Sequence, residues 1–169
     1  MNPFETLGAE ARFDLDLGAL EKRHRELSRA LHPDKFAQTG ASERRAALEK
    51  AAQVNEAWRI VRDPIRRAEA LFRIAGVEVG ETKEPKPDPM FLMEMLELRE
   101  AVAEARAKKD RAKIEELAAA IGARKESAEK KLAAGLGAGD APKVVGLLGE
   151  LRFYKRFLEA TEDDEEEVA

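Results

Sequence analysis

The sequence contains no cysteine, only two histidines and no long apolar run. Without cysteine the chain can have no disulfide, no thiolate zinc site and no cysteine nucleophile. His24 and His32 alone are too few for a conventional metal site. No segment approaches the roughly 20 apolar residues of a membrane-spanning helix, and the N-terminus lacks the apolar core of a signal peptide. We therefore expect a cytoplasmic protein with no cofactor, no bound metal and no membrane partner.

Signals of an enzyme or of a nucleic-acid-binding protein are also missing. Gly135, Gly137 and Gly139 follow no strand and lack the spacing of a dinucleotide-binding loop, so they indicate the end of a helix. No nucleophile–base pair is visible. The formal net charge is −4, and no domain is strongly basic. We predict that the protein is not an enzyme and does not bind nucleic acid.

The composition instead indicates an all-α protein. Of the 169 residues 38% are charged and 44% hydrophobic, with long stretches of Ala, Glu, Lys, Arg and Leu. We predict an N-terminal helical domain over residues 1–76, a proline-rich linker over 77–88 and a three-helix domain over 89–160. The acidic residues 161–169 are expected to form a frayed, solvated tail.

Apolar periodicity and capping residues predict the helices of the first domain. One helix carries the stripe Leu20, His24, Leu27 and Leu31 and ends before Pro33. A second begins at about Ser42 as N-cap, and a third begins at Asp63-Pro64. The expected core positions of these two are Leu48, Ala51, Asn55, Trp58, Val61, Ile65, Ala68, Leu71 and Phe72.

The second domain is predicted to contain three helices joined by short turns. They span about residues 89–109, with Asp88 as cap and Pro89 first, then 110–134 and 141–160. Short connections between long amphipathic helices favour an antiparallel bundle. Its expected core stripes are Phe91, Met95, Leu98, Val102 and Ala105; Ile114, Leu117, Ile121, Ala128 and Leu132; and Val144, Leu148, Leu151, Tyr154 and Leu158.

The tripeptide His32-Pro33-Asp34, followed by Lys35-Phe36, lies between the first two predicted helices. Pro33 fixes the backbone direction, Asp34 offers a carboxylate and His32 a donor and an acceptor nitrogen. The helix before it carries the cationic side chains Lys22, Arg23, Arg25 and Arg29, and Lys35 extends this basic face. By themselves these features could be an Asp that caps a turn and a helix face that is merely solvated.

The flanking residues make the region resemble a J-domain. The similarity runs from Pro3-Phe4-Glu5-Thr6-Leu7 through His32-Pro33-Asp34-Lys35 to Asn55-Glu56-Ala57-Trp58 and Asp63-Pro64. The resemblance implies that His32, Pro33, Asp34 and Lys35 contact a DnaK-type chaperone and stimulate its ATPase. It also implies that Lys22, Arg23, Arg25 and Arg29 dock electrostatically on that chaperone.

The helix after Pro89 has more apolar residues than one core stripe needs. Leu92, Met93 and Leu96 lie on neighbouring faces and are followed by Glu97, Glu100 and Glu104. Phe153 and Phe157 likewise fall off the stripe of the last helix. They form either an exposed surface for a partner, bordered by acids, or simply a wider core.

These segments narrow the resemblance to the HscB family of J-type co-chaperones in iron–sulfur cluster biogenesis. Its residues here are Phe91 to Glu100, Leu151-Arg152-Phe153, Asp34-Lys35-Phe36 and Arg67-Ala68-Glu69. The resemblance implies that Leu92, Met93, Leu96, Glu97, Glu100, Glu104 and Phe153 bind the iron–sulfur cluster scaffold protein, with Arg99 and Arg152 nearby. It also implies delivery of that scaffold to an HscA/DnaK-type chaperone. A general J-protein with a different client and a purely structural helical adaptor remain alternatives.

Overall fold

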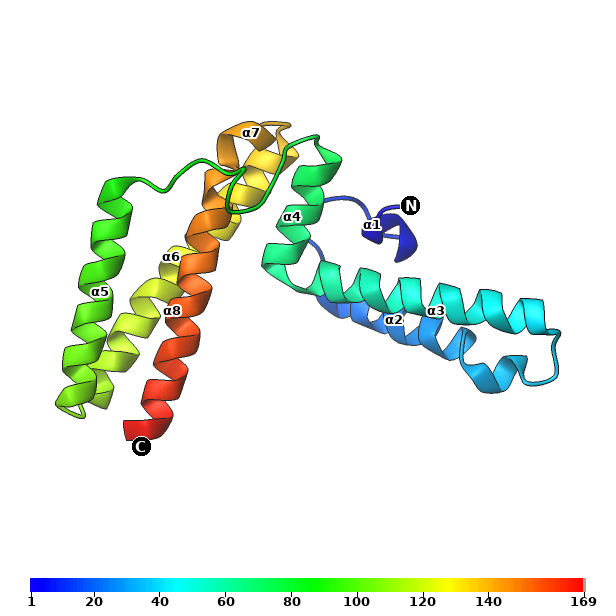
Figure 1. Ribbon diagram of the computed structural model, residues 1–169, viewed down its shortest axis with the longest axis horizontal. Coiled ribbons are helices and arrows are strands. Elements are labelled where there is room, and N and C mark those ends of the chain that lie inside the picture. The colour runs from blue at the N-terminus through cyan, green and yellow to red at the C-terminus, as the bar shows by residue number, and fades with distance from the viewer. Residues whose placement is uncertain (169) are drawn as a thin grey trace. The chain divides into compact units, whose positions relative to one another are not determined.

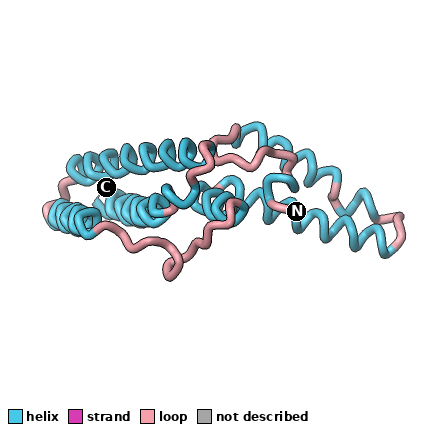
Figure 2. The backbone as a smooth tube through the Cα atoms, turned by 90° about the horizontal axis from the view of Figure 1, so that it is seen from above, coloured by secondary structure: helices cyan, strands magenta, loops and turns pink. Residues whose placement is uncertain are grey.

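A computed structural model describes the backbone of residues 1–168 and the side chains of residues 1–164. Over this part of the chain the secondary structure is helical, with loops and no strand, as Figure 2 shows. The all-α prediction is confirmed. The chain divides into two compact units, Met1–Ile74 and the residues from Ala75 onward.

The first unit is built on a helical hairpin whose arms lie side by side in Figure 1. Its elements are α1 (Pro3–Thr6), α2 (Leu17–Ala30), the 3₁₀ helix η1 (Pro33–Phe36), α3 (Ala41–Arg62) and α4 (Pro64–Ile74). Asp16 caps α2, because its Oδ1 accepts from the amide of Ala19 at 3.0 Å. The side chains of Phe4, Leu7, Val54, Val61 and Phe72 are fully buried and form the centre of the core.

The predicted start of α3 was wrong, and its predicted inward face was only partly right, because Val61 is buried as expected and Ala51 and Trp58 are half-buried. The helix begins at Ala41 after Gly40, which makes no side-chain capping bond, so Ser42 is not the N-cap. Leu48 is 57% exposed, and Asn55 is exposed too, whereas Ala47, Val54, Ala57 and Val61 are buried. Small side chains allow helices to approach closely, and here Ala47 is buried where the hydrophobic pattern assigned Leu48.

The second unit is a bundle of three long helices, α5 (Pro89–Ala107), α6 (Arg111–Gly137) and α8 (Gly146–Val168), with the short helix α7 (Ala141–Val144). Helix α6 packs against both α5 and α8. Helices α5 and α8 run in the same direction and α6 runs opposite to them, as Figure 1 shows. The predicted core stripes are buried apart from Leu98, Val144 and Leu158, which are half-buried.

The predicted third helix of this unit is interrupted after Val144, and α6 is longer than expected. Gly135 does not end α6, which continues to Gly137 and stops before Gly139, where φ is +75°. A Cβ atom at Gly135 would lie 2.4 Å from Cγ1 of Val144. Gly135 therefore lets α7 pack directly on the backbone of α6, and the chain then starts the separate helix α8.

The acidic segment differs from the predicted solvated tail. Helix α8 continues past Ala160 to Val168. Thr161 and Asp164 are buried, and Asp164 forms an ion pair with Arg106 on α5. Phe157, expected off the core stripe, is buried as well. The side chains of Glu165, Glu166 and Glu167 lie outside the described residues.

Candidate functional sites

The His32-Pro33-Asp34 loop is a single turn of 3₁₀ helix whose cap is the histidine. His32 has an extended backbone (φ −60°, ψ 136°), and its ring Nδ1 accepts from the amide of Asp34 at 3.2 Å. The amide of Lys35 donates to the His32 carbonyl at 3.0 Å. Pro33 occupies the first position, where its missing N–H is no loss. His32 and Pro33 therefore fix the backbone from which Asp34 projects.

The carboxylate of Asp34 is left to solvent. Its side chain is 91% exposed, and its contact is with the His32 ring, 3.5 Å from Nδ1 to Oδ2. His32, not Asp34, makes the capping bond of this turn. Asp34 is therefore not present merely to cap the turn. An exposed carboxylate on a rigid turn is suited to bind a cationic group of another molecule.

The cationic side chains of α2 are partly engaged by contacts within the chain. The guanidinium of Arg23 donates from Nη1 to the carbonyls of Leu7 and Gly8, so it ties α2 to the loop after α1. Arg25 lies 3.9 Å from the carboxylate of Glu21. Lys22 and Arg29 are exposed and have no ion pair among the described side chains. These two remain as cations available to a partner.

One contact of the first unit was missed by the sequence analysis. The rings of His24 and Trp58 stack, with centroids 5.6 Å apart and planes inclined by 18°. His24 Nε2 also lies 2.9 Å from Oδ1 of Asn55 and 3.4 Å from Oγ of Ser28. Asn55 and Trp58 thus join α3 to α2 through His24. Their role is to hold the hairpin that presents the loop.

The surplus apolar residues of α5 are exposed, which decides between the two interpretations of them. Leu92, Met93 and Leu96 are 40%, 57% and 58% exposed, while Phe91 and Met95 on the inner face are buried. On a helix with 3.6 residues per turn, Leu92 and Leu96 share one face. Met93 shares the neighbouring outward stripe with Glu97, Glu100 and Glu104. The predicted scaffold-binding residues of α5 therefore form one continuous outer surface.

The acidic edge of this surface is only partly engaged within the chain. Glu104 accepts from Nζ of Lys108 at 2.7 Å, and this hydrogen bond lowers the pKa of its carboxyl. Glu97 and Glu100 are exposed and have no ion pair among the described residues. They are the carboxylates that remain open to a basic partner.

Phe153 of α8 extends the apolar surface beside α5. Its ring meets Phe91 edge to face, with centroids 5.6 Å apart. Arg99 and Arg156 lie over the same ring, 6.0 and 4.9 Å from its centroid. Arg152 is held differently, because its Nη1 lies 2.7 Å from both carboxylate oxygens of Glu84 in the connector. Arg152 therefore positions the connector on α8.

A polar cluster on the other side of α5 joins the three long helices. The Arg124 guanidinium lies over the rings of Phe91 and Tyr154 and donates to Glu94 at 2.7 Å. Burial raises the pKa of the Tyr154 hydroxyl, and it also raises the pKa of the nearby Glu150 carboxyl. The cluster ties the three long helices of the bundle together.

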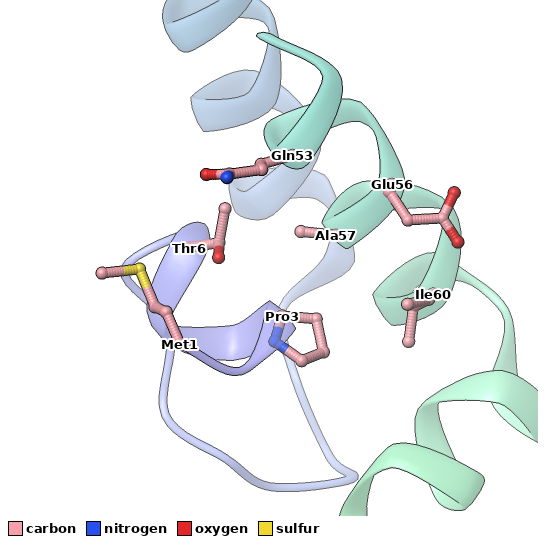
Figure 3. A pocket seen from close by; sticks show the side chains of 7 residues that line it. All are labelled: Met1, Pro3, Thr6, Gln53, Glu56, Ala57 and Ile60. Atoms are coloured by element: carbon pink, nitrogen blue, oxygen red, sulfur yellow. The ribbon is translucent and has the colours of Figure 1, made fainter. Parts of the chain in front are cut away.

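A shallow pocket of the first unit lies where α1 packs on α3. Figure 3 shows Met1, Pro3 and Thr6 on one side and Gln53, Glu56, Ala57 and Ile60 on the other. Its carboxylate, Glu56, pairs with Arg59 at 3.0 Å, so the pocket presents no catalytic pair. Among the described residues no group of acidic or histidine side chains could hold a metal ion, and no helix could span a membrane.

Comparison with known proteins identifies the family. Residues 87–162 match the model of the HSCB C-terminal oligomerisation domain. The HscB chaperone of Vibrio cholerae superimposes on the whole chain and over its own whole length, with a TM-score of 0.89 and 31% identity. The chain belongs to the HscB family of co-chaperones. Its all-α fold is accordingly an N-terminal J-domain followed by a C-terminal helical bundle.

Other relatives agree with this assignment. The HscB homologue of Vibrio vulnificus is 43% identical over 62% of this chain and 61% of its own length, so the chain spans about three-fifths of that relative. Human HscB matches 96% of this chain and 81% of its own, with a TM-score of 0.86 and 23% identity. Yeast Jac1 matches 96% of this chain and 92% of its own length, with a TM-score of 0.76 and 22% identity. The last two likenesses support the fold alone.

Proposed function

We propose that this HscB-family protein stimulates the ATPase of an HscA/DnaK-type chaperone and brings to it the scaffold protein that carries an iron–sulfur cluster. The cluster is cargo of the scaffold, and the co-chaperone does no chemistry of its own. The observation that carries the proposal is the exposed carboxylate of Asp34, on a turn whose backbone is held by His32 and Pro33. Such a group is built for contact with another molecule.

In the proposed mechanism each unit contributes one binding event. The J-domain presents Asp34 and the loop residues His32, Pro33 and Lys35, and Lys22 and Arg29 attract an acidic surface of the chaperone. The outer surface of α5, with Phe153, holds the scaffold through Leu92, Met93 and Leu96. When both are bound, the scaffold is at high effective concentration near the chaperone. Hydrolysis is then coupled to the presence of the client.

The test is the steady-state ATPase rate of an HscA-type chaperone with this protein, with and without the scaffold. We expect stimulation by the protein alone and a larger, synergistic stimulation with the scaffold. Asp34→Asn should abolish both, because it removes the charge and leaves the size of the side chain. Asp14→Asn is the matched control, since Asp14 is an exposed aspartate of the same unit.

The results separate the candidate functions. Normal stimulation by a folded Asp34→Asn protein would refute the role of that carboxylate. Stimulation that is indifferent to the scaffold would indicate a general J-protein with a different client. No stimulation of either an HscA-type or a DnaK-type chaperone would leave a structural adaptor.

A further inference from the structure

A groove between α5 and α8 continues from the apolar surface toward the C-terminal ends of both helices. It is lined by Arg99, Val102, Ala103, Arg106, Arg156, Phe157, Ala160, Thr161 and Asp164, and its volume is about 240 Å³. The groove exists because α6 packs against both helices, while α5 and α8 touch each other less closely. A groove of this size has room for a side chain of a partner. Its floor is apolar, with Val102 and Phe157 buried.

The rim of the groove is positive although the second unit is acidic. Three arginines, Arg99, Arg106 and Arg156, face one carboxylate, Asp164. Asp164 pairs with Arg106, so that arginine is neutralised within the chain. Arg99 and Arg156 have no carboxylate partner among the described side chains and contact the ring of Phe153. Two cations at the edge of an apolar groove thus have no anionic partner among the described side chains.

The groove is continuous with the surface proposed to hold the scaffold. Arg99 lies one turn beyond Leu96 on α5, and Arg156 lies one turn beyond Phe153 on α8. Phe153 contacts both arginines and the ring of Phe91. The outward stripe with Glu97 and Glu100 borders the Leu92–Leu96 face along its length. The apolar strip therefore has acids along one side and cations at its C-terminal end.

We propose that the groove receives an acidic segment of the scaffold protein, in which an aliphatic or aromatic side chain enters the cavity and neighbouring carboxylates pair with Arg99 and Arg156. The inference rests on the proposed function of the α5 surface and adds the chemistry and orientation of the bound partner. A partner with basic groups along one side of an apolar strip and acidic groups at one end of it fits in one direction only. The two charged borders thereby select a single docking orientation.

The experiment is titration calorimetry of the full chain with the full-length scaffold protein. The test variant is Arg99→Gln/Arg156→Gln, and the conservative variant is Arg99→Lys/Arg156→Lys. The control is Arg111→Gln/Lys130→Gln, which removes two exposed cations of α6 that lie outside the groove. We expect the glutamine pair to weaken binding about tenfold or more and the lysine pair to keep most of the affinity, because the carboxylates need positive charge. The control should bind like the wild type.

A purely structural role of the two arginines predicts a different pattern. If they only hold Phe153, the glutamine pair lowers Tm and affinity together, and the dependence of affinity on NaCl concentration is unchanged. If the arginines pair with carboxylates of the scaffold, the glutamine pair keeps the wild-type Tm, and its affinity falls less steeply with NaCl concentration than the affinity of the wild type. The structural pattern would overturn the inference, as would a change in self-association seen by sedimentation, which would identify a second copy of the chain as the occupant.

Failure of the inference and failure of the proposed function are distinguishable in the same titrations. If Leu92→Ala/Leu96→Ala weakens binding but the glutamine pair does not, the α5 surface binds the scaffold and the acidic segment does not occupy the groove. If the wild-type chain does not bind the scaffold at all, the proposed function falls and the inference falls with it.

Discussion

The two candidate surfaces of this protein are built in different ways. The loop of the J-domain is polar, and its geometry comes from backbone hydrogen bonds and from Pro33, so that one carboxylate, Asp34, is presented alone. The surface of the bundle is apolar and comes from side chains in excess of what the core of α5 needs. A polar site of the first kind should depend on a single residue. A surface of the second kind should depend on a few apolar anchors that become buried on binding.

The largest effect is expected from removal of the apolar surface of the bundle. Leu92→Ala/Leu96→Ala/Phe153→Ala should weaken scaffold binding by about 2–4 kcal/mol, because buried apolar anchors dominate interface energies. Titration calorimetry measures the loss. ATPase stimulation in the absence of scaffold should be unchanged, since the J-domain is untouched. Leu48→Ala serves as control, because Leu48 of α3 is as exposed as Met93.

The opposite result would be informative. If the triple variant binds the scaffold with wild-type affinity, the exposed apolar residues of α5 are irrelevant to the client. If instead the triple variant loses both scaffold binding and the ATPase stimulation measured without scaffold, the two surfaces do not act separately.

A substitution at Gly135 should destabilise the bundle and leave the J-domain intact. Gly135→Ala places a Cβ against Val144, which should destabilise the bundle by about 1–3 kcal/mol through overpacking. Thermal or urea unfolding measures the change. Val144→Ala in the same chain should restore much of the stability by making room. Equal stability of Gly135→Ala and wild type would show that α7 shifts without cost.

Substitutions of two cations of α2 distinguish a structural role from a role in docking on the chaperone. Arg23→Gln should cost about 1 kcal/mol of stability, because it removes the hydrogen bonds to the carbonyls of Leu7 and Gly8. Lys22→Gln should leave stability unchanged and raise the concentration needed for half-maximal ATPase stimulation. If Arg23→Gln is as stable as Lys22→Gln but reduces ATPase stimulation more, Arg23 belongs to the chaperone-docking face.

The smallest expected effect concerns Glu150 in the polar cluster of the bundle. Burial raises the pKa of its carboxyl, so its ionisation in the folded state is unfavourable and the associated stability is lost as pH rises through the folded pKa. Glu150→Gln should therefore give a small rise in Tm at pH 7. The difference should vanish below the pKa of an unfolded glutamate, where the wild-type carboxyl is also neutral. Unfolding at both pH values checks the sign, and a fall in Tm at pH 7 would show that the attraction of Arg124 and Lys131 outweighs burial.

Much of the fold could be predicted because local signals mark the helix boundaries. Asp16 caps α2, and Asp63 and Asp88 accept from backbone amides just after Pro64 and Pro89. The start of α3 carries no such signal, since Gly40 makes no side-chain bond. Its inward face was misassigned because in an alanine-rich helix the pattern does not decide between Ala47 and Leu48, and helix packing selects the smaller residue.

Contacts between distant segments were beyond the reach of the sequence. The burial of Asp164 depends on Arg106, which lies on another helix, so the acidic run looked like a solvated tail. The break between α7 and α8 depends on the absence of a side chain at Gly135. Spacing showed that α5 has more apolar residues than one core stripe needs, but it left open whether they are exposed or widen the core, and the structure shows Leu92, Met93 and Leu96 exposed.

The hydrogen bond that closes the His32 turn also determines where the imidazole proton resides. Because Nδ1 accepts from the Asp34 amide, a neutral ring must carry its hydrogen on Nε2. The loop then presents a ring N–H donor next to a carboxylate acceptor. A partner must offer an acceptor to His32 and a donor to Asp34, so the pair selects one orientation of the partner.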